Sequence, residues 1–208
     1  MQGARRARIA AWLGVAGLLA SPPAQQVAGA ASLHRPHRRR SSSHAPSATC
    51  AGADLTPGPS DMTAVARATL CLVNRERSAH RLRPLTESGA LDRAARAYSL
   101  AMVRHGYFSD SAPGGGTLGQ RVARSGYARS TRRPHTMRLV SVAENLATAS
   151  GRLASPAAIV SMWMRSPSHR ANLLGSSYRG SGIGVALGVP GSAGESGATY
   201  TQYFGSLR

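Results

Sequence analysis

Three kinds of side chain that hydrolases use for nucleophilic catalysis occur in this sequence: the serines Ser166 and Ser168, the imidazole of His169 and the carboxylate of Asp110. In a catalytic triad the histidine takes the proton of the serine hydroxyl, and the carboxylate orients the imidazole. The chain has no G-x-S-x-G turn to present such a serine. A serine directly beside the histidine is also a poor arrangement for a nucleophile, so we do not expect a serine triad here.

The two cysteines, Cys50 and Cys71, can be a nucleophile, a metal ligand or a disulfide. Neither has a nearby histidine or the spacing of a zinc site, which disfavours the first two roles. An even number of cysteines in a chain with an export signal (below) favours a disulfide. The bridge would tie the start of the domain to its first helix, and closing a loop of about 20 residues contributes on the order of 3 kcal/mol.

Helical periodicity and capping residues predict the elements that position these groups. Apolar residues recur at helical spacing from the N-cap Ser60 to about Ala79, and again from Ser88 to about His105, with Gly106 ending the second helix. Three shorter helices are predicted after Thr117, Ser155 and Ser166, at residues 118–125, 156–165 and 167–174.

The pattern changes to alternation near the end of the chain. Residues 183–187 and 200–204 predict two antiparallel strands, with 190–197 as their flexible connection, and the Arg-rich stretch 128–138 predicts a surface loop. Helices first and strands last indicate an α+β fold, in which helices pack on a small antiparallel sheet. Three aromatic residues fall at core spacing and are predicted to serve in packing: Tyr98, Trp163 and Phe204.

Several short motifs occur together and in order. They lie at residues 71–77, 106–110, 143–147 and 163–174, followed by Gly182-Ile-Gly-Val and Tyr200-Thr-Gln-Tyr-Phe-Gly. Their order and spacing resemble the bacterial branch of the CAP/SCP superfamily, which includes cysteine-rich secretory proteins, venom antigens and plant pathogenesis-related proteins. The resemblance covers about residues 62–207. It implies an α-β-α sandwich with a small central antiparallel sheet and an open cleft.

The resemblance also implies that the cleft holds His and Glu side chains able to bind a divalent metal, often zinc. Matched by position, Glu144 is the Glu of the family's G-E-N motif, although Ala143 replaces the Gly. His169 is the His of the S-P-G-H-R motif, with Ser168 in place of the Gly. The cleft residues expected from the resemblance are Asp110, Glu144, Asn145, His169 and Gln202.

Two positions depart from the family pattern. Asp110 stands where the family has its first histidine, and Tyr203 where bacterial members usually have Asp or Asn. A metal held by Glu144, His169 and Asp110 would have a harder, oxygen-rich site than the zinc site that two imidazoles make. Glu144 and His169 could also act without metal as a catalytic base and acid, because their ordinary pKa values bracket weakly acidic pH.

The same residues also have a structural interpretation, which the sequence leaves open. Glu144 would then bond the backbone at a strand end, His169 would brace its short helix, and Arg170 and Asn172 would hold loops. His105, at the end of its predicted helix, is interpreted as a surface residue that suits the helix dipole.

The first 30 residues have the layout of a secretory signal peptide. Arginines near the start precede an apolar run at residues 9–20, which is shorter than the ~20 residues needed to span a bilayer. Ala28-Gly29-Ala30 fits a cleavage site, and we expect cleavage there. An uncleaved membrane anchor is the alternative, which Pro22-Pro23 disfavours because prolines break a longer helix. The arginine pair at the start matches a twin-arginine signal only weakly.

Residues 31–49 are predicted to be a flexible, basic linker rich in Ser, Pro, His and Arg, and residues 50–208 a single domain. We interpret the linker histidines and arginines as a solvated tether. All basic residues other than histidine are arginines, 26 against 8 acidic residues, and the chain after residue 40 keeps a net charge of about +11. Outside a cell this charge favours wall polymers, anionic lipid headgroups or extracellular DNA as partners, while solubility alone is the alternative.

Three functional hypotheses follow. The first is a secreted or envelope-associated module that binds a lipid, a cell-envelope component or a partner protein in its cleft. The second is a peptidase-like hydrolase, in which Glu144 and His169 activate water with or without a metal such as zinc. The third is charge-driven binding of polyanions, without specific nucleic-acid recognition, because no nucleic-acid-reading motif is present. We expect no transmembrane segment in the mature chain.

Overall fold

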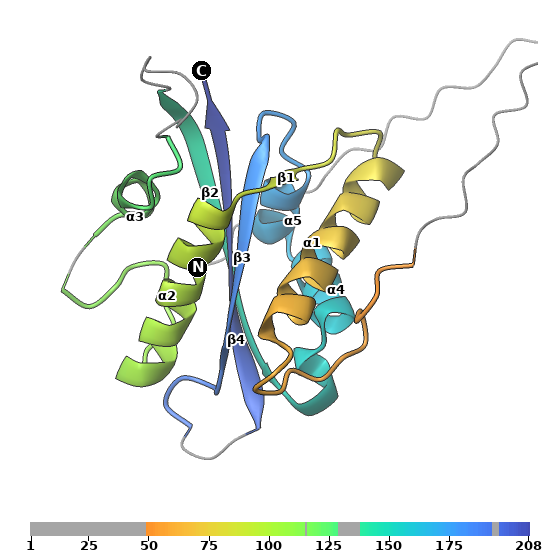
Figure 1. Cartoon of the computed structure of the whole chain (residues 1–208), viewed down its shortest axis with the longest axis vertical. Helices are drawn as coiled ribbons and strands as arrows, with labels where there is room; N and C mark the ends of the chain where they lie inside the picture. Colours follow the sequence, from red (N-terminus) through yellow and green to blue (C-terminus); the bar gives the residue numbers. More distant parts are fainter. Residues whose placement is uncertain (1–48, 115, 129–137, 193–195) are drawn as a thin grey trace, which may run out of the picture. The chain divides into compact units, whose positions relative to one another are not determined.

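The described strands form one mixed sheet with the order β1-β3-β4-β2 (Figure 1). The computed structural model describes residues 49–114, 116–128, 138–192 and 196–208, all within one compact unit, residues 45–208. Strand β4 pairs antiparallel with both β2 and β3, whereas β1 pairs parallel with β3. The strands are β1 (Thr86–Glu87), β2 (Leu139–Ser150), β3 (Gly180–Leu187) and β4 (Gly197–Leu207).

The helices begin and end largely where the capping residues predict. Ser88 accepts a hydrogen bond from the backbone N–H of Leu91 (3.5 Å), and Gly106 ends the same helix with a φ of 65° in the left-handed region. Thr117 and Gln120 form a reciprocal capping box. The helices are α1 (Met62–Ala79), α2 (Gly89–His105), α3 (Leu118–Arg124), α4 (Pro156–Arg165) and α5 (Pro167–Leu173), with a 3-10 turn η1 (Gly151–Ala154).

One predicted cap is wrong. The N-cap of α1 is Asp61 rather than Ser60, and no side chain bonds the first turn. The Ser60 hydroxyl donates to the Asp61 carboxylate instead (3.2 Å), and neither side chain caps the helix. The cap predicted at Ser155 is confirmed, because its Oγ accepts the N–H of Ala158 (3.4 Å).

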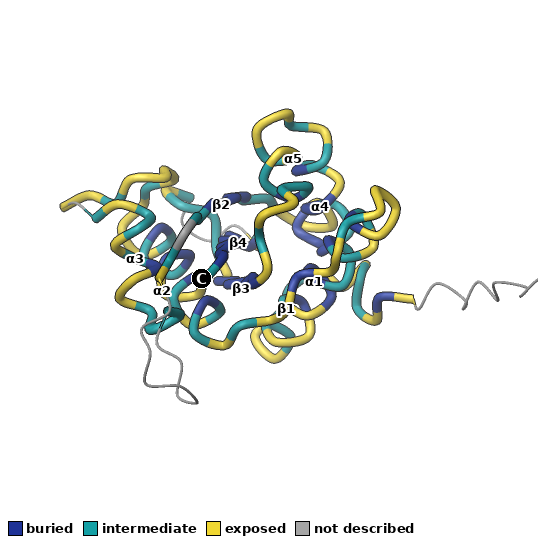
Figure 2. Tube along the Cα trace, turned by 90° about the horizontal axis from the view of Figure 1, so that it is seen from above, coloured by how far each residue is buried: buried dark blue, intermediate teal, exposed yellow. Residues whose placement is uncertain are grey.

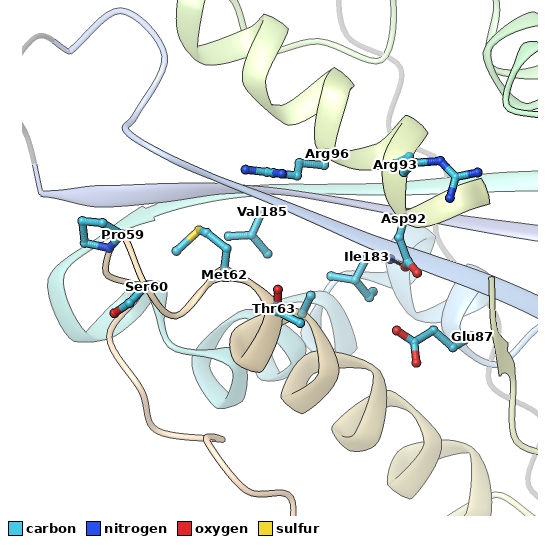
Figure 3. A pocket seen from close by; sticks show the side chains of 11 residues that line it. Pro59, Ser60, Met62, Thr63, Glu87, Asp92, Arg93, Arg96, Ile183 and Val185 are labelled. Carbon is cyan, nitrogen blue, oxygen red and sulfur yellow. Dashed lines mark hydrogen bonds between the residues drawn. The ribbon is translucent and has the colours of Figure 1, made fainter. Parts of the chain in front are cut away.

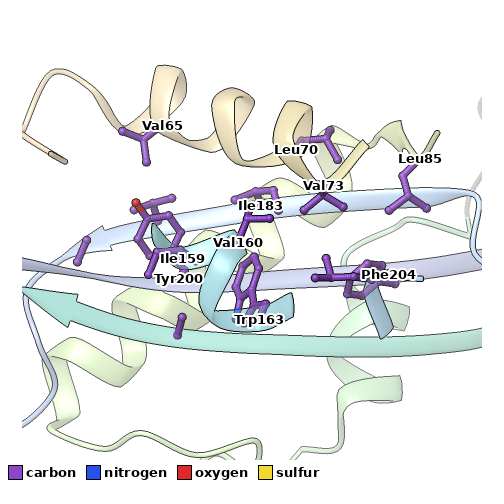
Figure 4. Packing of buried hydrophobic residues seen from close by; sticks show 14 of the residues in the cluster. Val65, Leu70, Val73, Leu85, Ile159, Val160, Trp163, Ile183, Tyr200 and Phe204 are labelled. Carbon is purple, nitrogen blue, oxygen red and sulfur yellow. The ribbon is translucent and has the colours of Figure 1, made fainter. Parts of the chain in front are cut away.

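Helices cover both faces of the sheet, which confirms the predicted α-β-α sandwich. Seen along the strands, α1, α4 and α5 lie on one side and α2 and α3 on the other (Figure 2). The first face buries the larger core, in which α1 and α4 pack on the sheet around Trp163 and Phe204 (Figure 4). The buried Trp163 indole donates to the Leu146 carbonyl (2.9 Å). The packing roles predicted for Trp163 and Phe204 are therefore confirmed.

Strand β3 lets α2 approach unusually closely because it carries glycine at alternate positions. A Cβ atom at Gly184 would lie 1.9 Å from the backbone nitrogen of Arg96, and one at Gly182 would lie 2.3 Å from that of Asp92. Backbone atoms cannot yield as a flexible side chain can, so any side chain at these positions would push α2 off the sheet.

The predicted disulfide is present. Cys50 and Cys71 are bonded, with their Cα atoms 5.7 Å apart, and no free cysteine occurs in the part of the chain that the structure describes. The bridge joins the segment before α1 to the middle of α1, as expected.

Strand β2 is the long element that the sequence patterns did not predict; the two-residue strand β1 was not predicted either. The residues of β2 alternate between the two covered faces of the sheet: Ala143 and Ala147 contribute to the core under α1 and α4, while Leu146 packs under α2. Polar residues also fall on both faces, Asn145 on the first and Glu144 on the second, so the segment lacks the alternation by which β3 and β4 were predicted. The sheet is also mixed rather than purely antiparallel, because the two-residue strand β1 pairs parallel with β3.

Several sequence predictions fall on residues that the structure does not describe. These are the signal peptide at 1–30, the linker at 31–49 except its last residue, residues 129–137 of the predicted surface loop and residues 193–195 of the β3–β4 connection. Within the described ranges, no helix combines the length and the apolar character needed to cross a membrane.

Candidate functional site

Glu144, the acidic residue singled out by the motifs, is closed in an ion pair with Arg121. One guanidinium nitrogen of Arg121, Nη2, lies 2.6 Å from Oε1 and 2.8 Å from Oε2 of Glu144. The two side chains are only 11% and 5% exposed, respectively. Both carboxylate oxygens are thus occupied by a single buried cation.

Arg121 also has partners on its other atoms. Its Nε donates to the Tyr203 hydroxyl (3.0 Å), and its Nη groups donate to the backbone carbonyls of Gly116 (2.8 Å) and Asp110 (3.0 Å). Its Cζ lies 4.0 Å from the centroid of the Tyr98 ring, a cation–π geometry. The guanidinium therefore joins the loop after α2 to strands β2 and β4.

Local structure explains why Arg121 points at the sheet. The capping box at Thr117 starts α3, which places Leu118, Arg121 and Val122 on one helical face. Val122 is fully buried against α2 and the sheet, so this face turns inward and carries Arg121 with it. On the sheet, Glu144 and Tyr203 are register partners of β2 and β4 and therefore share that same face.

Burial dominates the electrostatics of the pair. Removal from water raises the pKa of Glu144 from an ordinary 4.5 to about 7, against the lowering influence of the charge and hydrogen bonds of Arg121, and nearby Asp110 adds to the rise. Burial acts to lower the pKa of Arg121, but Tyr203 and Glu144 more than offset this and raise it. Burial likewise raises the pKa of Tyr98 to about 12. Arg121 therefore stays charged while Glu144 titrates near neutral pH.

The other predicted cleft residues lie on the opposite face of the sheet from Glu144 or away from its carboxylate. Asn145 and Gln202 are register partners one position along from Glu144 and Tyr203, so their side chains face α4 and α5. Asn145 donates to the backbone carbonyl of His169 (3.1 Å), and the buried Gln202 donates to the Ser181 hydroxyl (3.0 Å).

The histidine itself is held by its backbone rather than by its ring. Asn172 donates to the Glu144 carbonyl (3.0 Å) and to the Asn145 side-chain oxygen (2.9 Å), so α5 is fastened to β2 beside His169. The His169 Nδ1 atom is buried, and no described residue hydrogen-bonds it; the same holds for Oε1 of Gln202. No described hydrogen bond joins the imidazole to Glu144.

Asp110 and the two serines complete the predicted set. Asp110 is exposed, and only its backbone carbonyl touches Arg121. The hydroxyls of Ser166 and Ser168 bond each other (3.3 Å), and no hydrogen bond among the described residues joins either hydroxyl to the His169 ring. Of the structural roles considered for these residues, Asn172 does hold neighbouring segments together, whereas the Glu144 carboxylate lies in mid-strand on Arg121 and not on backbone groups.

The residues present do not fit a divalent metal as they are arranged. Among the described residues no three His, Cys, Asp or Glu side chains are grouped so as to hold a metal ion. The Glu144 oxygens face a guanidinium, whose positive charge would repel a second cation at the same place. The predicted ligands Glu144, His169 and Asp110 are therefore not drawn together by this geometry.

Sequence reasoning missed Arg121 entirely and assigned Tyr98 to packing alone. The signal for Arg121 was an arginine placed three residues after Leu118 and next to Val122, on the apolar face of a short predicted helix. A charged residue on such a face needs a buried partner. Tyr98 is indeed buried, at 5% exposure, but its ring also lies against the Arg121 guanidinium.

Comparison with known sequences identifies a family and a relative. Residues 70–204 match the family described as CAP, the cysteine-rich secretory protein family. The uncharacterized protein YkwD of Bacillus subtilis (strain 168) is 29% identical over 149 residues, which cover 72% of this chain and 50% of YkwD. The chain therefore spans half the length of that relative.

Comparison with solved structures gives the same fold. An extracellular protein containing an SCP domain, from Bacillus anthracis str. Ames, is 26% identical with a TM-score of 0.54, over 71% of this chain and 44% of that one. An outer surface protein of Borrelia burgdorferi (16% identity, TM-score 0.53, 67% and 90% covered) and a cysteine-rich secretory protein of Staphylococcus aureus (18%, 0.50, 71% and 40%) share the fold alone. The predicted fold class is thereby confirmed.

Proposed function

The chain belongs to the CAP, or cysteine-rich secretory protein, family, and from this premise we propose that it works outside the cytoplasm as a module that binds an anionic component of the cell envelope. Two of the similar structures are of proteins described as extracellular or of the outer surface, which agrees with the export signal predicted at residues 1–30. Family membership does not specify a partner. The proposal therefore rests on the surface of this chain.

One observation carries the proposal: most of the positive charge on the described residues is exposed and lies outside any ion pair. Of the 16 arginines that the structure describes, 14 are exposed, and only Arg77 and Arg121 are not. Between described residues, the pair of Arg121 with Glu144 is the single ion pair. Exposed guanidinium groups without acidic partners bind phosphate and carboxylate groups in a planar, two-point geometry.

The test is co-sedimentation of the mature protein with purified cell walls, and with vesicles that contain either anionic or only zwitterionic lipids. We expect binding to the walls or to the anionic vesicles that falls at least about tenfold between 50 and 300 mM salt, because exposed charges are screened. Two double variants compare the contributions of two surfaces to this binding. Arg165→Gln with Arg170→Gln changes the surface around α5, and Arg67→Gln with Arg75→Gln changes that of α1. Equal binding to zwitterionic vesicles, or binding indifferent to salt, would refute the proposal.

A second candidate is a hydrolase that depends on Glu144, and one observation favours it. Burial raises the pKa of Glu144 to about 7, where a carboxyl group can both accept and donate a proton at neutral pH. The ion pair with Arg121 counts against it, because both oxygens must be freed before they can reach a substrate. The Glu144→Gln and His169→Ala variants should each fail to turn over peptide substrates derived from cell walls. The surface control Arg104→Gln should keep its activity. Turnover that survives both substitutions would remove this candidate.

A further inference from the structure

A groove of about 320 Å³ lies along the edge of β3, between α1 and α2, away from the Glu144 pair. Figure 3 shows its walls: Arg93 and Arg96 come from α2, Met62 from α1, and Ile183 and Val185 lie between them on β3. The two β3 side chains are 3% and 2% exposed, so they form a firm apolar floor.

Strand β1 already uses the first part of this edge. Its two residues pair parallel with Gly180 and Ser181, at the start of β3. From Gly182 to Leu187 no described strand pairs with β3 on that side, because β4 lies on the other. The groove thus continues the position of β1 beside β3 in the plane of the sheet. It lies between α1 and α2, which cover the two faces of the sheet.

The backbone of β3 presents hydrogen-bonding groups to the groove along this edge. In an antiparallel ladder, every second residue directs its backbone N–H and C=O to the partner strand. The residues between them direct these groups to the opposite side, here called the outward set. The outward set includes Ser181, whose carbonyl accepts the N–H of Ser88 (2.9 Å), and Ile183, whose N–H donates to Asp92 Oδ1 (2.8 Å). Val185 belongs to the same set, and no described residue supplies a partner for its N–H or its carbonyl.

We propose that this groove binds an extended peptide segment of a partner protein as an added strand, with an acidic side chain of the peptide on Arg96. Backbone bonds to Val185 would give affinity, and alternate side chains would give specificity, as in other cases of strand addition. Arg93 and Arg96 are exposed and make no ion pair with any described residue, which supplies the charge complementarity. Glu87, at the β1 end, would repel an acidic residue and so helps to set the register.

A fatty acyl chain is a poorer fit to the same groove. Its walls include Glu87, Asp92, Arg93 and Arg96, and a hydrocarbon would take these charged groups out of water without pairing them. An extended peptide pairs them with its own amides and side chains. This site is separate from the envelope binding proposed above, and its test is run at 300 mM salt to suppress diffuse charge attraction.

The probe is a synthetic nine-residue peptide of alternating valine and threonine with one central glutamate, titrated into the mature protein. One control peptide carries N-methyl groups on alternate amides, which removes the backbone donors, and a second has lysine in place of the glutamate. The protein variant is Arg96→Glu, matched by Arg104→Glu on the same helix but outside the groove. Dodecanoate serves as the lipid probe. Hydrogen exchange of the Val185 amide reports where each probe binds.

Peptide binding should slow exchange of the Val185 amide at least about tenfold, since a new hydrogen bond protects it. Arg96→Glu or the lysine peptide should weaken binding about tenfold or more, in line with the loss of a charge-assisted bond, and Arg104→Glu should leave it unchanged. Equal affinity for the N-methylated peptide, an unaltered Val185 amide, no peptide binding at millimolar concentration, or protection by dodecanoate alone would each overturn the proposal.

Discussion

The raised pKa of Glu144 makes a specific prediction about stability, and Glu144→Gln is the perturbation that isolates it. Glutamine has nearly the same shape and can still accept hydrogen bonds from Arg121, but it does not titrate. The substitution also changes the strength of those bonds, which adds an offset that does not depend on pH. The quantity of interest is therefore the change with pH in the stability difference between the wild type and the variant.

The sign follows from proton binding. The pKa of Glu144 is about 7 in the folded protein and about 4.5 when unfolded, so between these values the folded state holds more protons. Its contribution to stability is complete below pH 4.5 and is lost as pH rises through 7. Because the side chain is 5% exposed, no large discount for solvent applies. A pKa difference of this size corresponds to a loss on the order of 3 kcal/mol in the free energy of unfolding.

The assay is urea unfolding of the wild type and Glu144→Gln at pH 4.5, 6, 7 and 8 in constant salt. We expect the wild type to lose stability relative to the variant mainly between pH 4.5 and 7, where the folded state holds the extra proton, and to change little more by pH 8. Glu76→Gln, on α1, is the control for removing an acidic residue. A difference that stays constant from pH 4.5 to 8 would refute the argument that burial outweighs Arg121, because the pKa of Glu144 would then be no higher in the folded protein than in the unfolded chain.

Four further outcomes test the fold and the site. Arg77→Met should cost about 3 kcal/mol or more in urea unfolding, because the buried guanidinium donates to three backbone carbonyls, one of them at the end of α5; a loss below about 1 kcal/mol would contradict this. Cys71→Ala together with Cys50→Ala should cost about 3 kcal/mol, and reduction should do nothing further to that variant. Gly184→Ala should destabilise by at least about 2 kcal/mol and alter the far-UV signal of α2, whereas normal unfolding would show that α2 can shift freely. Zinc titrated calorimetrically should give no micromolar binding, and such binding, if lost in His169→Ala, would show that the site rearranges to take a metal.

Local chemistry explains why the helices could be predicted from the sequence. The caps at Ser88, Thr117 and Ser155 depend on residues at most three positions away, and each side chain satisfies backbone donors that the helix leaves free. Strands β3 and β4 were found for the same reason, through their alternation. Strand β2 was missed because it carries polar residues toward both faces and so lacks a regular alternation, and because its pairing with β4 joins residues far apart in the chain, such as Ala147 and Tyr200.

The candidate site likewise combines a residue that a local motif identifies with a partner that only tertiary packing places. The motifs identified Glu144, but its partner Arg121 lies 23 residues earlier in a helix that carries no motif. Ion pairing depends on the distance between two atoms, and that distance is set by how α3 packs on the sheet. A sequence pattern can indicate that a charged residue faces inward. It does not indicate which charge meets it there.

The side chains of Glu144 and Asn145 lie on opposite faces of the sheet, and this gives the Glu-Asn motif a structural role that requires no catalysis. Successive side chains of a strand point to opposite faces, so Glu144 reaches α3 through Arg121 while Asn145 reaches α5 through the carbonyl of His169. Asn172 returns a bond from α5 to the Glu144 carbonyl. The Glu-Asn pair thus fastens a helix from each layer to one point of β2. Geometry of this kind would retain both residues in a protein that only binds, and a catalytic role for Glu144 would require Arg121 to move first.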